Sequence, residues 1–140
     1  CMRSLGQAEK ALELMVKRAG NREAFGKTIL KLGKNLEVIS RARIEIDAMR
    51  LMVLQAAKAM DVMGNKEARV YVSAIKAMVP EKVCVIIDQA MQMHGATGIS
   101  HWSPLPDMYH HQRHLRFADG PDEVHHMVVG RAEAQKHGAW

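Results

Sequence analysis

Aromatic residues make up only 4% of this 140-residue sequence, and it contains just two cysteines and four prolines. The low aromatic content, beside eleven methionines, favours helices packed by flexible aliphatic side chains. Cys1 and Cys84 are too few for a disulfide framework, which favours a reducing compartment over a secreted protein. No apolar run approaches the roughly 20 residues that a membrane-spanning helix needs, so no membrane span is expected.

The net charge of +5 does not by itself indicate a nucleic-acid partner. Lysine and arginine concentrate between Lys17 and Lys34, where Glu23 is the only acid. No stacking aromatics are interleaved with them, which argues against binding to single strands. A local basic cluster suits a phosphorylated small molecule as well as a nucleic-acid backbone, and it can also be a plain solvated surface. We therefore predict no nucleic-acid partner.

Apolar residues recur at helical spacing along the chain and predict an all-α fold. Stripes run over residues 2–19, about 36–63 and 67–93, and a short helix ends near Phe117 before a final helix that starts at Asp119. The turn at Gly64-Asn65 separates the second and third helices, and Pro80 predicts a kink in the third. No segment alternates like a β-strand. We predict an antiparallel (four-)helix bundle forming a single domain over residues 1–140.

The stripes define a predicted core. The apolar positions are Leu5, Ala8, Leu12, Met15, Val16 and Ala19; Leu36, Ile39, Ile46, Met49, Val53, Ala56, Met60 and Met63; and Val72, Ile75, Val79, Val83, Ile86, Ala90 and Met93. The last helix continues the pattern through Val124, Met127, Val128 and Ala132. This framework is scaffold, so the chemistry is expected in the stretch from Gln92 to His126.

Asp119, directly before Gly120-Pro121, is the candidate catalytic residue. A carboxylate at a loop-to-helix junction can reach a bound substrate and act as a general base on a carbon acid. Aspartate is also a preferred N-cap, so the same residue could simply begin the last helix. Spacing alone leaves both interpretations open.

Histidines between residues 110 and 126 raise the question of a metal site. His110 and His114 are spaced i, i+4, and Glu123 with His126 forms a Glu-x-x-His unit. A carboxylate-bridged di-iron bundle needs two such units and two further glutamates, and only one unit is present. We predict no metal ligand, and a metal-binding bundle stays a third interpretation of the chain.

Arg22 and Phe25 are candidate nucleotide contacts within Arg-Glu-Ala-Phe-Gly-Lys. A rigidly held arginine can bind a pyrophosphate through two hydrogen bonds, and a neighbouring phenylalanine can pack on a ring. No Walker or Rossmann glycine pattern occurs, so helix ends and side chains would have to bind a nucleotide. The plainer interpretation is a basic loop with one buried aromatic.

Three motifs, taken together, closely resemble the C-terminal helical domain of the acyl-CoA dehydrogenases. They are Arg22-Glu-Ala-Phe25-Gly26-Lys27, Gln92-x-x-Gly95-x-x-Gly98 and Asp119-Gly120. The resemblance covers essentially the whole chain, and the ending from Leu115 to His125 is similar to the branch that contains family members ten and eleven. It implies the C-terminal domain of a longer enzyme, whose N-terminal helical and middle β-domains are missing from this sequence.

The resemblance implies FAD-dependent α,β-dehydrogenation of a fatty acyl-CoA to the trans-2-enoyl-CoA, a reaction of fatty acid β-oxidation, with electrons leaving through electron-transfer flavoprotein. Asp119 stands where the family usually has its catalytic glutamate, although some members carry the base a few residues before the position of Cys1. The implied FAD contacts are Arg22, Phe25, Gln92, Gly95 and Gly120. Gln92 and Gly95 would largely meet a cofactor held by the adjoining subunit.

The resemblance also implies a homodimer or homotetramer, located in the mitochondrial matrix or peroxisome of a eukaryote or in the cytoplasm of a bacterium. The isolated chain is expected to be inactive, because it holds only part of the active-site walls. The alternative is a non-catalytic helical oligomerisation or interaction module. Ala96 and Pro121, which depart from the family's pattern at cofactor contacts, favour that alternative.

Overall fold

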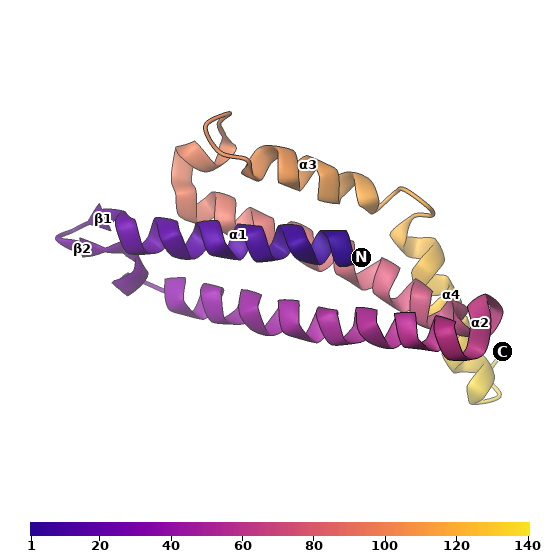
Figure 1. Cartoon of the computed structure of the whole chain (residues 1–140). Helices are drawn as coiled ribbons and strands as arrows, with labels where there is room; N and C mark the ends of the chain where they lie inside the picture. Colours follow the sequence, from indigo (N-terminus) through magenta and orange to yellow (C-terminus); the bar gives the residue numbers. More distant parts are fainter.

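The computed structural model describes residues 1–140 and is almost entirely helical, which confirms the predicted all-α fold (Figure 1). The first elements are α1 (Met2–Asn21), the strands β1 (Glu23–Ala24) and β2 (Lys27–Thr28), and the 3-10 helix η1 (Ile29–Lys31). They are followed by α2 (Asn35–His94), the 3-10 helix η2 (Gly95–Ile99), α3 (Leu105–Leu115) and α4 (Asp122–Lys136). No helix combines the length and the apolar character needed to cross a membrane.

The long element α2 consists of two antiparallel helices joined at Gly64. The φ and ψ angles of Gly64 are 80° and 168°, a conformation that glycine adopts far more readily than other residues. Residues 35–63 and 65–94 therefore run in opposite directions, as the predicted turn requires (Figure 1). The predicted kink at Pro80 does not interrupt the helix: Pro80 is buried, and Gly64 is the only residue of α2 with non-helical angles.

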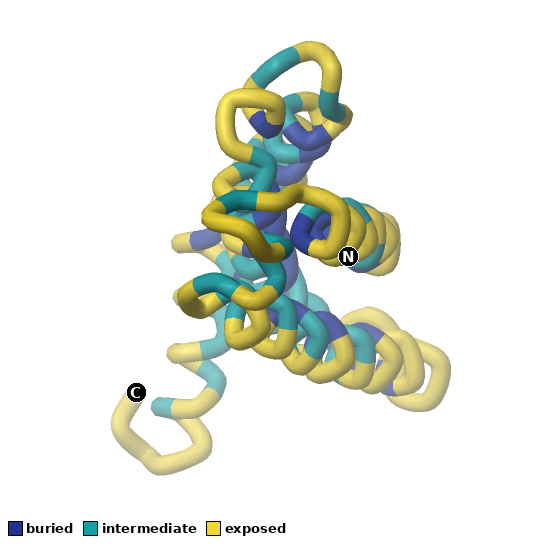
Figure 2. The backbone as a smooth tube through the Cα atoms, turned by 90° about the vertical axis from the view of Figure 1, so that its left-hand side faces the viewer, coloured by how far each residue is buried: buried dark blue, intermediate teal, exposed yellow.

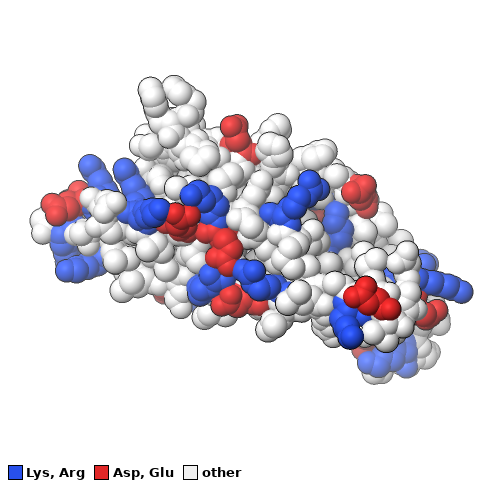
Figure 3. All heavy atoms as spheres, viewed as in Figure 1, with Lys and Arg blue, Asp and Glu red and all other residues white.

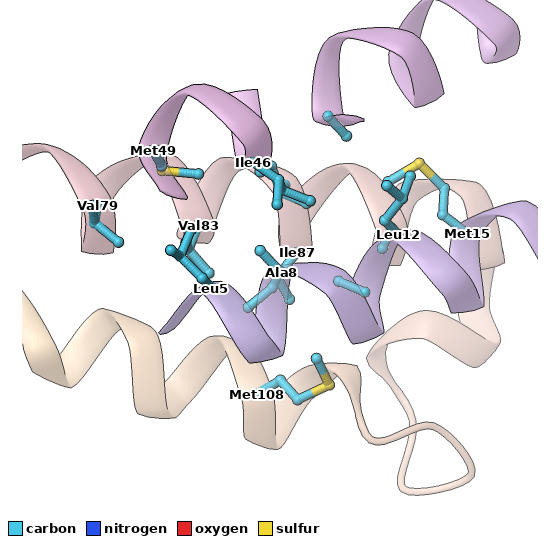
Figure 4. Close-up of a cluster of buried hydrophobic side chains, with 14 of the residues drawn as sticks. Leu5, Ala8, Leu12, Met15, Ile46, Met49, Val79, Val83, Ile87 and Met108 are labelled. Carbon is cyan, nitrogen blue, oxygen red and sulfur yellow. The ribbon is translucent and has the colours of Figure 1, made fainter. Parts of the chain in front are cut away.

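The hydrophobic core lies between α1, the two halves of α2, and α3 (Figures 2 and 4). Its largest fully buried apolar side chains are Leu5, Met15, Ile46, Met49, Ile87, Leu105, Val79 and Val83. With α1 and α3, the halves of α2 form the four helices of an up-and-down bundle. The centres of the predicted stripes are thus confirmed as core.

Some residues of the predicted stripes are exposed. Leu36 and Met63 lie at the surface because they are at the ends of their stripe. Val16 and Met60 are exposed although the neighbouring Met15 and Ala59 are buried, because they face away from the core. The last helix, α4, packs on α2, yet its only buried residue is Asp122. Its apolar side chains are therefore available to contacts outside this chain.

Two local predictions are wrong. The chain does contain strands, a hairpin in which Glu23 pairs with Thr28 and Ala24 pairs with Lys27. The final helix begins at Asp122 and not at Asp119, because residues 119–121 form a turn before it.

Candidate functional site

Phe25 and Gly26 form the turn of the hairpin, and both have positive φ angles, 53° and 74°. Two left-handed residues in succession are typical of the type I′ hairpin turn, which usually has the sequence Asn-Gly. A left-handed conformation costs a non-glycine residue roughly 1–2 kcal/mol. The Phe25 side chain is 94% exposed, so burial within this chain does not offset that cost, and the interpretation as a buried aromatic is wrong. A strained, exposed phenylalanine points to a role in binding.

Arg22 lies directly after α1 and directly before β1, where its carbonyl accepts a hydrogen bond of 2.8 Å from the backbone nitrogen of Ile29. Its side chain is exposed and takes part in none of the chain's ion pairs. Lys27, Lys31 and Lys34 are likewise exposed, and Figure 3 shows lysine and arginine atoms gathered at this end of the molecule. The unpaired guanidinium and the exposed ring together fit a ligand that has an anionic part and a flat part.

Gln92 and Gly95 lie beside the hairpin, at the carboxyl end of α2. A surface cavity of about 320 Å³ is lined by Phe25 and Gln92, and a neighbouring cavity of about 310 Å³ is lined by Gln92 and Gly95. Arg18 connects α1 with the carboxyl end of α2, because its Nη2 donates a hydrogen bond of 3.4 Å to the carbonyl oxygen of His94. We call Arg22, Phe25, Gln92 and Gly95 the hairpin end.

Gly98 allows the chain to turn tightly after α2. A Cβ atom at this position would lie 2.3 Å from the carbonyl oxygen of Met91, a distance that no side chain tolerates. The backbone of η2 therefore lies directly against the last turns of α2 because residue 98 is glycine. This contact fixes Gly95 and its neighbours relative to Gln92.

Asp119 and Gly120 form the turn between α3 and α4, with φ angles of 57° and 102°. Aspartate tolerates the left-handed region better than most residues do. The carboxylate is exposed and has no hydrogen bond or ion pair within the chain. Pro121 occupies the N-cap position of α4, without a side-chain cap bond, so the interpretation of Asp119 as a helix cap is wrong. Its carboxylate is left available to a ligand.

An ion pair between half-buried Arg116 and buried Asp122 connects the two sides of the loop that contains Asp119. Arg116 Nε donates to Asp122 Oδ2 at 2.6 Å, and the backbone nitrogen of Asp122 donates to the Arg116 carbonyl at 3.2 Å. The hydrogen bond to Asp122 raises the pKa of Arg116. Further side chains reach the loop from outside: Lys76 Nζ donates to the Gly120 carbonyl at 3.0 Å, and His125 Nε2 lies 3.1 Å from the Asp119 carbonyl. We call Asp119 and Gly120, with these supports, the Asp119 end.

The two ends lie at opposite extremes of the bundle (Figure 1). Lys76 marks the Asp119 end and Gln92 marks the hairpin end on the same helix. Their separation in sequence corresponds to a rise of roughly 24 Å along the helix axis. Arg22, Phe25, Gln92 and Gly95 are thus brought together, whereas Asp119 and Gly120 are not brought into the same cleft within one copy of the chain.

Histidine, cysteine and carboxylate side chains do not gather in groups of three that could hold a metal ion. The nearest approach to such a group in sequence, Glu123 with His126, lies on the exposed surface of α4.

Comparison with known proteins identifies the family. Residues 1–134 match the family described as acyl-CoA dehydrogenase, C-terminal domain. The chain belongs to the acyl-CoA dehydrogenase family. It is 48% identical over 136 residues to the probable acyl-CoA dehydrogenase FadE2 of Mycobacterium tuberculosis, covering 97% of this chain and 33% of that protein. It is 47% identical over 133 residues to mouse acyl-CoA dehydrogenase family member 10, covering 95% of this chain and 12% of that protein.

Solved structures agree with this assignment. An acyl-CoA dehydrogenase homologue from Mycobacterium abscessus superimposes with a TM-score of 0.95 at 46% identity, covering 97% of this chain and 33% of the other. The helical fold is therefore that of the C-terminal domain of the acyl-CoA dehydrogenases. The chain spans about a third of the length of FadE2, so the larger part of such a protein lies outside the residues described above.

The first residue of the chain, Cys1, lies at the Asp119 end. The thiol of Cys1 donates to the carbonyl oxygen of Ile75 at 3.5 Å, which places the first residue of the chain beside Lys76. Lys76 in turn holds the Gly120 carbonyl. Cys1, at the start of α1, and the Asp119-Gly120 turn thus lie near the same part of α2.

Sequence reasoning missed the residues that hold the Asp119 turn. Ser73, Lys76 and His125 are ordinary polar residues within helices, and nothing in their spacing connects them with Asp119. Only the packing of α4 on α2 brings them together. The one available signal was the positive-φ tendency of Asp119-Gly120, a dipeptide whose backbone requires support from outside the turn.

Proposed function

We propose that the protein containing this chain is an FAD-dependent acyl-CoA dehydrogenase that converts a fatty acyl-CoA into the trans-2-enoyl-CoA. The main observation in support of this proposal is the Asp119 turn. Its backbone is left-handed at residue 119, and the exposed carboxylate has no partner within the chain. Family membership supports the assignment, since the resemblance places the family's base at this position. Asp119 would remove the α-proton of the thioester.

The residues at the hairpin end fit FAD as the cofactor. Arg22 is unpaired and suits a pyrophosphate, which a guanidinium binds through parallel hydrogen bonds. Phe25 presents an exposed ring beside the cavity that Gln92 also lines. Gly95 leaves the space beside Gln92 free of a side chain. At the Asp119 end, Gly120 likewise leaves the space beside Asp119 free.

When bound, FAD supplies the two-electron oxidation as acceptor of the β-hydride. The residues of this chain position the bound groups and remove one proton. The Asp119 carboxylate must lie within hydrogen-bonding distance of the α-carbon proton, because a general base acts through geometry before it acts through basicity. Aspartate is one methylene shorter than the family's usual glutamate, so the backbone at residue 119 has to approach the substrate more closely.

Because the two ends of one chain do not share a cleft, we propose that the protein acts as a homodimer or homotetramer in which each FAD contacts two copies. The exposed apolar side chains of Ile44, Leu51 and Val62 on one face of α2, and of Val124 and Met127 on α4, support contacts with further protein. Electron-transfer flavoprotein is the proposed electron acceptor. The proposed setting is the mitochondrial matrix or peroxisome in a eukaryote and the cytoplasm in a bacterium.

The test is Asp119→Asn in the intact protein, with Asp107→Asn as the matched control on the exposed first turn of α3. The wild type should be yellow, and acyl-CoA should bleach its flavin absorbance. Asp119→Asn should keep its FAD and lose substrate-dependent reduction by a factor of about 10² or more, the range in which general bases act. Asp107→Asn should behave as the wild type.

Each outcome has a distinct meaning. Unchanged flavin reduction by Asp119→Asn would move the base upstream of Cys1. A wild-type protein without flavin absorbance would refute the dehydrogenase and favour the non-catalytic interaction module. Turnover by the isolated 140 residues, supplied with FAD, acyl-CoA and an electron acceptor, would contradict the expectation that this chain holds only part of the site.

A further inference from the structure

The backbone of the Asp119-Gly120 turn is held by two side chains that belong to other elements. His125 Nε2, on α4, lies 3.1 Å from the Asp119 carbonyl oxygen, and Lys76 Nζ, on α2, lies 3.0 Å from the Gly120 carbonyl oxygen. Successive carbonyls of the turn are thus each engaged by a different helix. Since both turn residues have positive φ, their conformation depends on such outside contacts.

The partners of His125 fix the tautomer of its ring. The carbonyl oxygen of Asp119 can only accept a hydrogen bond, so Nε2 must carry the proton that it donates. In the neutral ring Nδ1 is then an acceptor, and it lies 3.3 Å from the hydroxyl oxygen of Ser73, which is buried. In that form the Ser73 hydroxyl donates to Nδ1, so a residue of α2 orients the ring on one side while the other side of the ring contacts the turn.

The turn also packs directly on the His125 ring. A Cβ atom built on Gly120 would lie 3.1 Å from His125 Nε2, closer than most real contacts allow. Residue 120 is therefore restricted twice, by its φ of 102° and by the ring beneath it. The carboxylate of Asp119 has no partner within the chain, so the direction of this side chain depends on the orientation of the peptide bond between Asp119 and Gly120.

We propose that His125 is a positioning residue for the Asp119 carboxylate, acting through its hydrogen bond to the Asp119 carbonyl, with Ser73 orienting its ring. This inference rests on the proposed role of Asp119 as the base. His125 does not touch the substrate and moves no proton. Its loss lets the Asp119-Gly120 peptide rotate, and a displacement of the base by about 1 Å can cost roughly a hundredfold in rate.

The experiment compares three substitutions of His125 in the intact flavoprotein. His125→Gln places an amide donor near the position of Nε2 and keeps the bond to the Asp119 carbonyl. His125→Asn is an amide of the same polarity that reaches only the position of Nδ1, and His125→Leu removes both bonds. His126→Leu, on the adjacent exposed residue without a hydrogen bond in the chain, is the matched control.

The expected result separates kcat from KM. His125→Leu and His125→Asn should lower kcat by about 10- to 100-fold, with KM for acyl-CoA and flavin content per chain nearly unchanged. His125→Gln should recover most of that loss, and His126→Leu should leave kcat as it is. Lys76→Met, which removes the second hold on the turn, should lower kcat further when combined with His125→Asn.

Several outcomes would overturn the inference. One is an unchanged kcat in His125→Asn, and another is a kcat in His125→Gln as low as in His125→Asn. A loss of flavin or of folded protein that accounts for the whole loss of rate would reduce His125 to a structural residue. If His125→Leu fails to fold, the comparison of the Gln and Asn substitutions still decides. Unchanged rates in the His125 series beside an inactive Asp119→Asn would refute the positioning role alone, whereas an active Asp119→Asn would refute the proposed base.

Discussion

Replacing Phe25 by asparagine should make the chain more stable and its cofactor binding weaker. Phe25 has a φ of 53° in a turn whose usual sequence is Asn-Gly, and Gly26 already follows it. Relief of the left-handed strain is worth roughly 1 kcal/mol with asparagine, which tolerates that region. The lost side-chain burial is small, because the ring is 94% exposed. The substitution should therefore stabilise the fold by about 1 kcal/mol, or roughly 3–4 °C in Tm for a chain of this size.

The same change should reduce the affinity of the intact protein for FAD. An aromatic contact contributes about 0.5–1.5 kcal/mol beyond its area, so removing the ring should raise Kd by roughly 2- to 12-fold. Phe25→Leu is the matched control, because it removes the ring and keeps the left-handed strain. It should weaken FAD binding without the gain in stability.

Urea unfolding of the 140-residue chain and titration of the flavin-free intact protein with FAD measure the two effects separately. A loss of stability in Phe25→Asn greater than about 0.5 kcal/mol would refute the reasoning, since it would mean that the ring packs against the fold or that the turn is not left-handed. Equal FAD affinity in the wild type and in Phe25→Leu would remove Phe25 from the cofactor site.

Three further predictions concern the scaffold. Gly98→Ala should destabilise the chain by about 1–3 kcal/mol in urea unfolding, because its Cβ would meet the Met91 carbonyl. Gly6→Ala, in open space on α1, should stabilise it by roughly 0.5–1 kcal/mol. A loss of stability in Gly98→Ala well below about 1 kcal/mol would contradict the close approach of η2 to α2. Arg43 donates to Glu9 at 2.8 Å and, with Arg50, lowers the pKa of Glu9, so this carboxylate contributes stability above its unfolded-state pKa and loses it as the pH falls through the lower folded-state pKa. The difference in unfolding free energy between the wild type and Glu9→Gln should therefore shrink on acidification. It should stay below about 1 kcal/mol, since the side chains are 37–40% exposed. A difference that grows as the pH falls would contradict this ion pair as a source of stability. Sedimentation at micromolar concentration should show a dimer or larger species that Leu51→Glu weakens, and a strictly monomeric wild type would argue against self-association.

The sequence predicted the bundle because period-3.6 stripes and glycine turns are local signals. Ile46, Met49 and Val83 were assigned to the core correctly, since the middle of a stripe faces a neighbouring helix wherever the helices cross. Leu36 and Met63 were not, because the helix length that a partner covers depends on tertiary packing. The hairpin escaped notice since Phe-Gly lacks the asparagine that marks a type I′ turn.

The candidate site residues stay a prediction, and their arrangement in space could not be predicted from the sequence. The hairpin with Arg22 and Phe25 is distant in sequence from Gln92, and the packing of α1 on α2 brings the two segments to one end. The capping role of Asp119 could not be rejected beforehand, because two acids stand near the start of α4 and either could have served. The contacts of His125 and Lys76 with the turn join residues that only the folded bundle places together.

The distance between the hairpin end and the Asp119 end has a genetic consequence. If each active centre draws one end from each of two copies, a cell carrying Arg22→Ala on one allele and Asp119→Asn on the other makes mixed dimers in which one centre inherits both intact ends. Random pairing would then leave about a quarter of all centres functional, although neither allele encodes a working enzyme. A self-contained centre would leave none, so the two alleles would fail to complement.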